Sequence, residues 1–383
     1  MSTLRVLHVG KFYPPHMGGI ETHLHALCTT LRDRGVDVRV VVASDDKQTT
    51  SGVVDGVPVT RLGTPVNLAA APINPGLART IRDAGADVVH VHLPHPAATI
   101  SYLTSRHRGP LVATYHSDIV RQRVMGAAYE PVQHRFLSRC SAIVATSPNY
   151  VATSPVLARH RDRCHVIPYG IPLDHFERAD PARVAELRAR FGDRVVISVG
   201  RLIYYKGFEF LIDAMREVRG KLLIVGSGPL RSALEQRARD AGVADRVELL
   251  GEIQNQDTVP YYHASDVFAL ASIARSEAFG IVQIEAMACG RPVVNTSLDS
   301  GVPFVSLDGV SGLTVPPRDP RALAAAINRL LDDAALRARL GEGARRRARA
   351  EFDVNTMTDR VMALYESVVA AAPRRGAAAA AVV

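Results

Sequence analysis

Two glutamates, Glu277 and Glu285, stand on either side of a predicted turn from a strand into a helix. Residues 266–271 form an apolar run that predicts a strand, Gly280 permits a tight turn, and residues 281–289 carry apolar side chains at helical spacing. Free N–H groups and the helix dipole favour an anion at a helix start. Two carboxylates beside an anion site suggest a ligand that has both hydroxyls and phosphates.

Two cations, Arg201 and Lys206, lie in a loop with a glycine at each end, between a predicted strand (194–199) and a predicted helix (208–218). The planar guanidinium and the compact ammonium both suit a diphosphate. Two cations in a loop are more often simple surface charge, so these residues alone leave both interpretations open.

A second glycine loop follows the first predicted strand, residues 5–9, and leads into a predicted helix at 20–34. The loop lacks the G-x-G-x-x-G pattern, which disfavours a dinucleotide. Gly18 and Gly19 can bring backbone N–H groups against a phosphate, or they can form an ordinary turn.

Histidines gather at the ends of two predicted strands. His90 and His92 end the strand at 87–92, and His116 leaves the next one, in residues 111–118. Alternate residues of a strand share a face, but no carboxylate or cysteine completes a ligand set, so no metal is expected. We expect His90 and His92 to line a cleft at the carboxyl ends of the strands.

The composition favours a two-domain α/β protein. The chain has 383 residues, 47% of them hydrophobic, and short apolar runs alternate with amphipathic ones. The net charge of +8 could serve nucleic acid, an anionic bilayer or a phosphorylated substrate. Nucleic acid is disfavoured because no basic tract is interleaved with aromatics and tryptophan is absent. The four cysteines have no zinc spacing, and the N-terminus enters a strand without a signal peptide, so we expect a cytoplasmic protein.

Three motifs together resemble the retaining glycosyltransferases of family four. They are Ser276-Glu-x-Phe-Gly-x4-Glu-Ala-Met-Ala-x-Gly-x-Pro-Val293, Ser198-Val-Gly-Arg-Leu-x3-Lys-Gly207 and Phe12-Tyr-Pro-Pro-x2-Gly-Gly-Ile-Glu-x-His23. The resemblance implies the GT-B architecture, an α/β fold of two facing Rossmann-like domains with a central cleft. The N-terminal, acceptor-side domain would be residues 1–170, and the nucleotide-sugar-binding domain 171–355. A final helix at about 356–373 would pack back on the first domain.

The resemblance also implies roles for individual residues. His116 would contact the transferred sugar near its reacting carbon, and Arg201 and Lys206 would bind the donor diphosphate. Glu277 would contact hydroxyls of the transferred sugar, and Glu285 those of the ribose. The other implied donor-binding positions are Gly18, Gly19, Gly226, Ile253, Phe279, Gly280, Ile281 and Val282.

The implied activity is the transfer of a hexose from a nucleotide sugar to an acceptor hydroxyl with retained anomeric configuration. No Asp-x-Asp occurs in the chain, so we expect leaving-group stabilisation without a metal and no other cofactor. Residues 201–212 resemble mannosyltransferases of bacterial polysaccharide assembly, which favours GDP-mannose and an α-linked product. UDP-glucose and UDP-N-acetylglucosamine stay open as donors. A nucleotide-sugar epimerase of the same architecture and an inactive nucleotide-binding module are the competing classes.

Residues 118–138 combine arginines (Arg121, Arg123 and Arg135) with apolar side chains such as Met125 and Phe136. This pattern fits a helix on an anionic membrane or a solvated surface helix equally well. Because the family often uses lipid-linked acceptors, peripheral contact with an anionic membrane is expected alongside a sugar or lipid-linked sugar acceptor.

Overall fold

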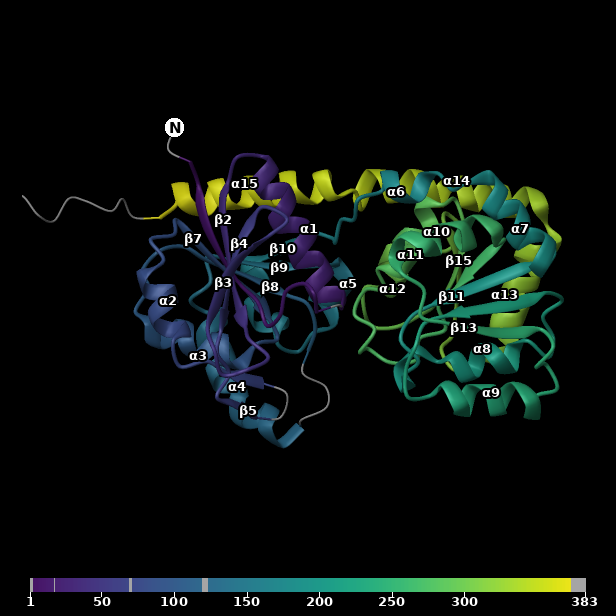
Figure 1. The fold of residues 1–383 in the computed structure, drawn as a ribbon, viewed down its shortest axis with the longest axis horizontal. Coiled ribbons are helices and arrows are strands. Elements are labelled where there is room, and N and C mark those ends of the chain that lie inside the picture. The colour runs from purple at the N-terminus through teal and green to yellow at the C-terminus, as the bar shows by residue number, and fades with distance from the viewer. Residues whose placement is uncertain (1–2, 17, 69–70, 119–122, 373–383) are drawn as a thin grey trace, which may run out of the picture. The chain divides into compact units, whose positions relative to one another are not determined.

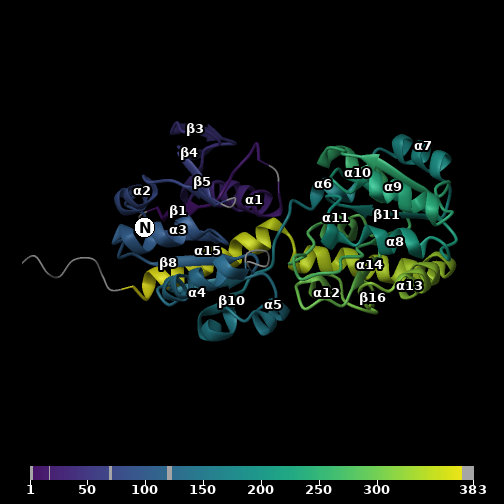
Figure 2. The same ribbon diagram turned by 90° about the horizontal axis from the view of Figure 1, so that it is seen from below.

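The computed structural model describes residues 3–16, 18–68, 71–118 and 123–372. The chain divides into two compact units (Figures 1 and 2). Unit 1 comprises the described parts of Met1–Ala145, Ser154–Ile167 and Met357–Val383, and unit 2 comprises Thr146–Thr153 and Pro168–Thr356. Over the described ranges, no helix combines the length and the apolarity that a membrane crossing needs.

Unit 1 is built on an eight-stranded sheet in the order β10-β9-β8-β7-β1-β2-β4-β3. All neighbours are parallel except β3, which runs antiparallel to β4. A separate two-stranded ribbon contains β5 (Val66–Leu68) and β6 (Ala71–Ile73). The strands of the large sheet are β1 (Arg5–Val9), β2 (Asp37–Ala43), β3 (Thr50–Val54), β4 (Val57–Leu62), β7 (Val88–Leu93), β8 (Leu111–Tyr115), β9 (Ala142–Ala145) and β10 (Cys164–Val166).

Helices cover both faces of this sheet (Figure 1). The last helix lies beside the first, because Arg34 at the end of α1 forms an ion pair with Asp359 of α15. The apolar side of α1 is buried at positions such as Leu24, Leu27 and Leu31, as its helical periodicity predicts. The helical segments of unit 1 are α1 (Gly19–Asp33), α2 (Leu77–Asp83), α3 (Pro96–Ser105), α4 (Arg123–Leu137), η1 (Leu157–Arg163) and α15 (Val354–Ala370, from Met357 onward).

Unit 2 has a six-stranded, all-parallel sheet in the order β13-β12-β11-β14-β15-β16. Its strands are β11 (Val195–Val199), β12 (Lys221–Val225), β13 (Val247–Gly251), β14 (Val267–Ala269), β15 (Val293–Thr296) and β16 (Gly312–Val315). Their near-continuous Val, Ile and Leu content matches a sheet that is buried on both faces. Two separate apolar clusters fill the two faces. One includes Phe268 and Ile284, and the other includes Leu211 and Ile327.

The helices of unit 2 follow the βα rhythm of the sequence. Asp180 caps α7 by accepting a hydrogen bond from the Ala182 N–H, and Pro181 takes the first turn, as the sequence predicts. The helical segments are α5 (Pro148–Thr153), α6 (Asp174–Glu177), α7 (Pro181–Phe191), η2 (Tyr204–Lys206), α8 (Phe208–Ala214), α9 (Arg231–Asp240), α10 (Asn255–Ala264), α11 (Val282–Ala288), α12 (Val302–Val305), α13 (Pro320–Asp332) and α14 (Ala334–Glu351).

Candidate functional site

The sheet of unit 2 has a topological switch point between β11 and β14. From β11 the chain moves outward to β12 and β13, then returns to β14 on the other side of β11. In such sheets the loops at the carboxyl ends of the two central strands diverge and leave room for a ligand. The loop after β11 begins at Gly200, and the loop after β14 contains Ile273, whose N–H donates to the carbonyl of Tyr205 at 2.9 Å. Both loops therefore meet where a mononucleotide is expected.

Lys206 and Glu277 form an ion pair across these two loops. The Lys206 Nζ lies 2.6 Å from the Glu277 Oε2, and the two side chains are only 11% and 9% exposed. The Ser272 hydroxyl donates a hydrogen bond to the same carboxylate oxygen at 3.0 Å. Because water is largely excluded, charges here interact more strongly than they would on an open surface. The structure thus places an ammonium and a carboxylate, from distant parts of the sequence, side by side at the switch point.

Glu285 lies in the first turn of α11 and is buried. The Tyr262 hydroxyl donates to its Oε2 at 2.7 Å. Burial raises the pKa of the Glu285 carboxyl, while the Tyr262 hydrogen bond and the nearby positive charge of Lys206 act in the opposite direction. Its carboxyl group is therefore oriented within the protein and lies in the field of the same lysine that binds Glu277.

Arg201 differs from Lys206 because its side chain is exposed. Among the residues the structure describes, no ion pair or side-chain hydrogen bond is assigned to its guanidinium. Burial raises the pKa of the nearby Tyr205 phenol, and the positive charges of Lys206 and Arg201 act in the opposite direction. The loop therefore presents one lysine that is already paired and one arginine that can turn its planar fork toward an anion.

Close backbone packing, rather than side chains, shapes the loop beside β12. Gly226 has φ +139°, and a Cβ atom there would lie 2.0 Å from the carbonyl oxygen of Gly200. Only glycine lets these two loops approach this closely. Gly280 has φ +77° at the turn before α11, and Ile253 is partly buried against the apolar core. The Phe279 ring packs edge-on against Tyr169 at 4.9 Å, so only the Phe279 backbone is available to a ligand.

Ile281 and Val282 lie at the start of α11 in unit 2, and the predicted site residues Gly18, Gly19 and His116 belong to unit 1. Gly18 caps the first helix, which begins at Gly19. The N–H of His116 donates to the Leu93 carbonyl at 3.0 Å, and its ring is buried beside His92, with the His116 Nε2 3.0 Å from the His92 Nδ1.

A group of buried histidines in unit 1 has pKa values far below the usual one. Burial lowers the pKa of His8 and His23 to about 3 and that of His95 to about 4, because a charged imidazole loses its hydration there. The pKa values of His90, His92 and His116 lie well below the usual value for the same main reason. At neutral pH these rings are uncharged.

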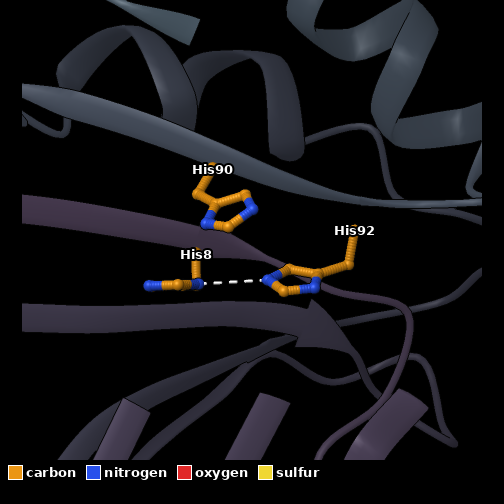
Figure 3. A group of neighbouring side chains, drawn as sticks. All are labelled: His8, His90 and His92. Carbon is orange, nitrogen blue, oxygen red and sulfur yellow. Dashed lines mark hydrogen bonds between the residues drawn. The ribbon is translucent and has the colours of Figure 1, made fainter. Parts of the chain in front are cut away.

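The expectation that His90 and His92 line a cleft is wrong, because both side chains are buried between the sheet and a helix. His90 bonds to the hydroxyls of Tyr365 on α15 and Thr114 on β8, at 2.5 and 2.7 Å. His92 lies beside His8, as Figure 3 shows. The cause is their register, since His8 pairs with His90 on adjacent parallel strands and both point to the same covered face.

Several residues at the site were missed from the sequence. Ser272 and Tyr262 orient the two glutamates, and His8 and Tyr365 complete the histidine cluster. Ser272 directly follows the apolar run 266–271, so its place at a strand end was the one available signal. The other three sit in ordinary core patterns, where nothing distinguishes them from packing residues.

The two parallel-sheet units define the GT-B class of fold, and sequence comparison identifies the family. The family described as "Glycosyltransferase Family 4" matches residues 17–175, and that described as "Glycosyl transferases group 1" matches residues 182–347. The chain belongs to the family-four glycosyltransferases, and it is a hexosyltransferase.

Individual relatives agree with this assignment. The chain is 34% identical to the O-antigen chain mannosyltransferase C of Escherichia coli over 369 residues, which cover 96% of this chain and 99% of that protein. It is 34% identical over 352 residues to the D-rhamnosyltransferase WbpZ of Pseudomonas aeruginosa, covering 91% and 92%. Among solved structures, the sucrose-phosphate synthase of Thermosynechococcus elongatus superposes with a TM-score of 0.78 at 25% identity, covering 96% of this chain and all of that one.

Proposed function

We propose that this enzyme transfers mannose from GDP-mannose to an acceptor hydroxyl and forms an α-linked product with retained configuration. The observation that carries the proposal is the Lys206–Glu277 ion pair at the switch point of unit 2, with the exposed Arg201 in the same loop. An ammonium and a guanidinium suit a diphosphate, and a buried carboxylate suits sugar hydroxyls.

The proposed reaction breaks the bond between the anomeric carbon and the diphosphate oxygen, and the electron pair leaves with the diphosphate. The acceptor oxygen attacks the same face of the sugar, and its proton passes to an oxygen of the leaving phosphate. Lys206 and Arg201 stabilise the charge that grows on the diphosphate, and this stabilisation is greater in the transition state than in the bound donor. Glu277 holds sugar hydroxyls and Glu285 holds those of the ribose. His116 contacts the transferred sugar.

The proposal also assigns backbone contacts with the donor. In unit 2 the N–H groups of Phe279, Gly280, Ile281 and Val282 are offered to phosphate oxygens at the turn into α11. Gly226 and Ile253 border the nucleotide. In unit 1, Gly18 and Gly19 at the start of α1 face the diphosphate.

Two features support the choice of sugar. One matched relative is named for mannose and the other for D-rhamnose. Since D-rhamnose is 6-deoxy-D-mannose, both names point to a sugar of the manno configuration. Support for the guanine base comes from the resemblance of residues 201–212 to mannosyltransferases of bacterial polysaccharide assembly.

A donor panel tests this proposal. The purified enzyme should release GDP from GDP-mannose in the presence of a mannosyl acceptor, and much less UDP from UDP-glucose or UDP-N-acetylglucosamine. NMR of the product should show the α-anomer, and activity should persist after thorough chelation. Arg201→Ala should lower the rate of GDP release by about 10-fold or more, because it removes a charge that is directed at the leaving group.

Other outcomes of this panel would contradict particular parts of the proposal. A β-linked product would rule out retention, and a strict UDP preference would rule out GDP-mannose. Formation of an epimeric sugar without transfer would indicate an epimerase. Loss of activity on chelation, restored by a divalent cation, would contradict the metal-independent role of Arg201 and Lys206.

We further propose that the acceptor is lipid-linked and that the enzyme contacts an anionic membrane surface peripherally. The net charge of +8 supports this. The predicted lipid-facing Phe136 does not, because its side chain in α4 is fully buried in unit 1. Arg121 lies outside the described residues, and the side chains of Arg123 and Met125 are not described.

The membrane proposal therefore predicts binding through charge. The protein should sediment with vesicles that contain anionic lipid, and should be released as the salt concentration rises, because exposed charges are screened. Zwitterionic vesicles serve as the control. Equal binding to both kinds of vesicle, or to neither, would disprove the contact.

A further inference from the structure

A chain of hydrogen-bonded rings runs through unit 1 from the last helix to His116. We call Tyr365, His8, His92 and His116 the histidine chain. The Tyr365 hydroxyl lies 3.4 Å from the His8 Nε2. The His8 Nδ1 lies 3.1 Å from the His92 Nε2, and Figure 3 shows this second bond. The His92 Nδ1 lies 3.0 Å from the His116 Nε2, and these two rings are stacked with planes 17° apart. All four side chains are buried.

A metal site is the competing use of these rings. His8, His90 and His92 form one group whose ligand atoms lie within 4.8 Å of one another, and His23, His92 and His116 form another. Zinc binds neutral imidazole nitrogens, but both groups consist of histidine alone, so nothing in them would offset a divalent charge in a buried position. Both ring nitrogens of His8 and of His92 also have a partner within hydrogen-bond distance. A metal would have to break the chain that these bonds form.

The hydrogen bonds in the chain must all point in the same direction. A neutral imidazole has one N–H donor and one acceptor nitrogen, and burial keeps these rings neutral. If His8 accepts from His92, then His92 must accept from His116. If His8 donates to His92, every bond reverses. The tautomer of His116 is therefore tied to the hydrogen position at the far end, on Tyr365.

The distances at Tyr365 select one of the two directions. Its hydroxyl lies 2.5 Å from the His90 Nδ1 and 3.4 Å from the His8 Nε2. The short distance lies at the lower end of the range for O–H donors and below the range for N–H donors, so we assign the donor role to Tyr365 and the acceptor role to His90. His90 then donates from its Nε2 to the Thr114 hydroxyl, 2.7 Å away. The Tyr365 oxygen is left to accept from His8.

We propose that His92 is a positioning residue for His116, and that His8 and Tyr365 act through it. The chain fixes the His116 ring and sets its tautomer, with the hydrogen on Nε2 and the lone pair on Nδ1. This tautomer in turn sets whether each nitrogen of the His116 ring donates or accepts a hydrogen bond when the transferred sugar binds. The catalytic part of this inference rests on the proposed function, which puts His116 against the sugar.

The tautomer can be measured without any substrate. Full-length protein labelled with ¹⁵N-histidine would be examined by NMR at pH 7.5, where a protonated ring nitrogen and one with a lone pair differ strongly in ¹⁵N shift. His116→Gln identifies the His116 signals. We expect a single His116 tautomer, with the hydrogen on Nε2, in the unsubstituted protein.

Two variants test the coupling. In Tyr365→Phe the His116 signals should shift toward a mixture of tautomers. Tyr102→Phe is the matched control, since Tyr102 is a buried tyrosine of the same unit and lies outside the histidine chain, so its signals should match the parent. With GDP-mannose and acceptor, His92→Ala should lower kcat about 10-fold or more, while the KM for the donor changes less, because the ring of His116 is no longer held.

Several outcomes would overturn the inference. A His116 ring that carries its hydrogen on Nδ1 would refute the histidine chain, and so would His116 signals that do not change in Tyr365→Phe. Stoichiometric zinc in the purified protein that is lost in His92→Ala would also refute it. Should Tyr365→Phe not fold, the tautomer in the unsubstituted protein decides alone. If the tautomer is as described but His116→Gln leaves kcat unchanged, then the role of His116 in the proposed function fails, and the catalytic consequence fails with it.

Discussion

Replacing Lys206 by alanine is expected to lower kcat by roughly 10²- to 10³-fold, the usual effect of removing one positioned charge from a developing anion. The Lys206 side chain is only 11% exposed and its Nζ lies 2.6 Å from the Glu277 Oε2, so the ammonium is held in place before the donor arrives. Steady-state kinetics with the best donor of the panel gives the measurement. Lys221→Ala is the control. Lys221 also belongs to unit 2 and is also paired with a glutamate, Glu248, but it lies at the amino end of β12, whereas the site lies at the carboxyl ends of the strands.

A double variant separates two explanations of that loss. Lys206→Ala leaves the Glu277 carboxylate buried without its cation, which by itself can distort the site. Adding Glu277→Gln removes this uncompensated charge and keeps the size of the side chain. Because Glu277 is itself assigned to the sugar hydroxyls, the Glu277→Gln single variant is the reference. If Lys206 acts on the leaving diphosphate, the double variant is slower than this reference. If the two are equally active, Lys206 serves only to neutralise Glu277, and the assigned role is wrong.

The second large effect is acid unfolding of unit 1. The buried histidines His8, His23, His90, His92, His95 and His116 have folded-state pKa values below that of an exposed imidazole, about 6.5. Below pH 6.5 the unfolded chain binds protons that the folded unit resists, so the free energy of unfolding falls as the pH falls. Each such group contributes roughly 1.4 kcal/mol per pH unit, so three acting together would remove roughly 4 kcal/mol between pH 6 and pH 5.

Urea unfolding followed by circular dichroism at pH 7.5, 6 and 5 measures this effect. The loss should continue toward pH 3, near the pKa values of His8 and His23. His8→Gln should flatten the pH dependence, because it removes one of the groups, whereas the exposed His175 replaced by Gln should leave it unchanged. A free energy of unfolding that stays constant from pH 7.5 to pH 5 would show that the cluster takes up protons without unfolding.

Most of the α/β framework could be predicted because its signals are local. The apolar runs of β1, β4 and β11 and the Asp180–Pro181 helix start follow directly from residue type and spacing. Strand β3 was missed because Thr50–Val54 is largely exposed and shows no apolar alternation. Proline favours the first turn of a helix, so Pro260 by itself predicts a start near Val259, but helix α10 begins at Asn255 and contains Pro260. Its first turn is polar, so the buried Thr258 and Tyr262, rather than periodicity, hold it in place.

The site could be predicted only as single residues. The motifs predicted Lys206 and Glu277 as separate site residues. Their contact could not be predicted, because it depends on β11 and β14 being neighbours in the sheet, and no local sequence pattern indicates strand order. His90 was misplaced for a related reason. His90 contacts Tyr365 rather than solvent because of its strand register and because helix α15 covers it. The register and the covering helix both depend on segments far away in the sequence.

The position of Tyr365 has a consequence for synthesis on the ribosome. Unit 1 begins with the first described residues, yet the helix that supplies a partner to His8 and His90 belongs to the end of the chain. All of unit 2 is translated between these two parts. As the chain emerges, all of unit 2 can therefore be synthesised while the sheet of unit 1 still lacks the helix that covers its histidines. Unit 1 is started first but can complete its fold only after unit 2 has been synthesised.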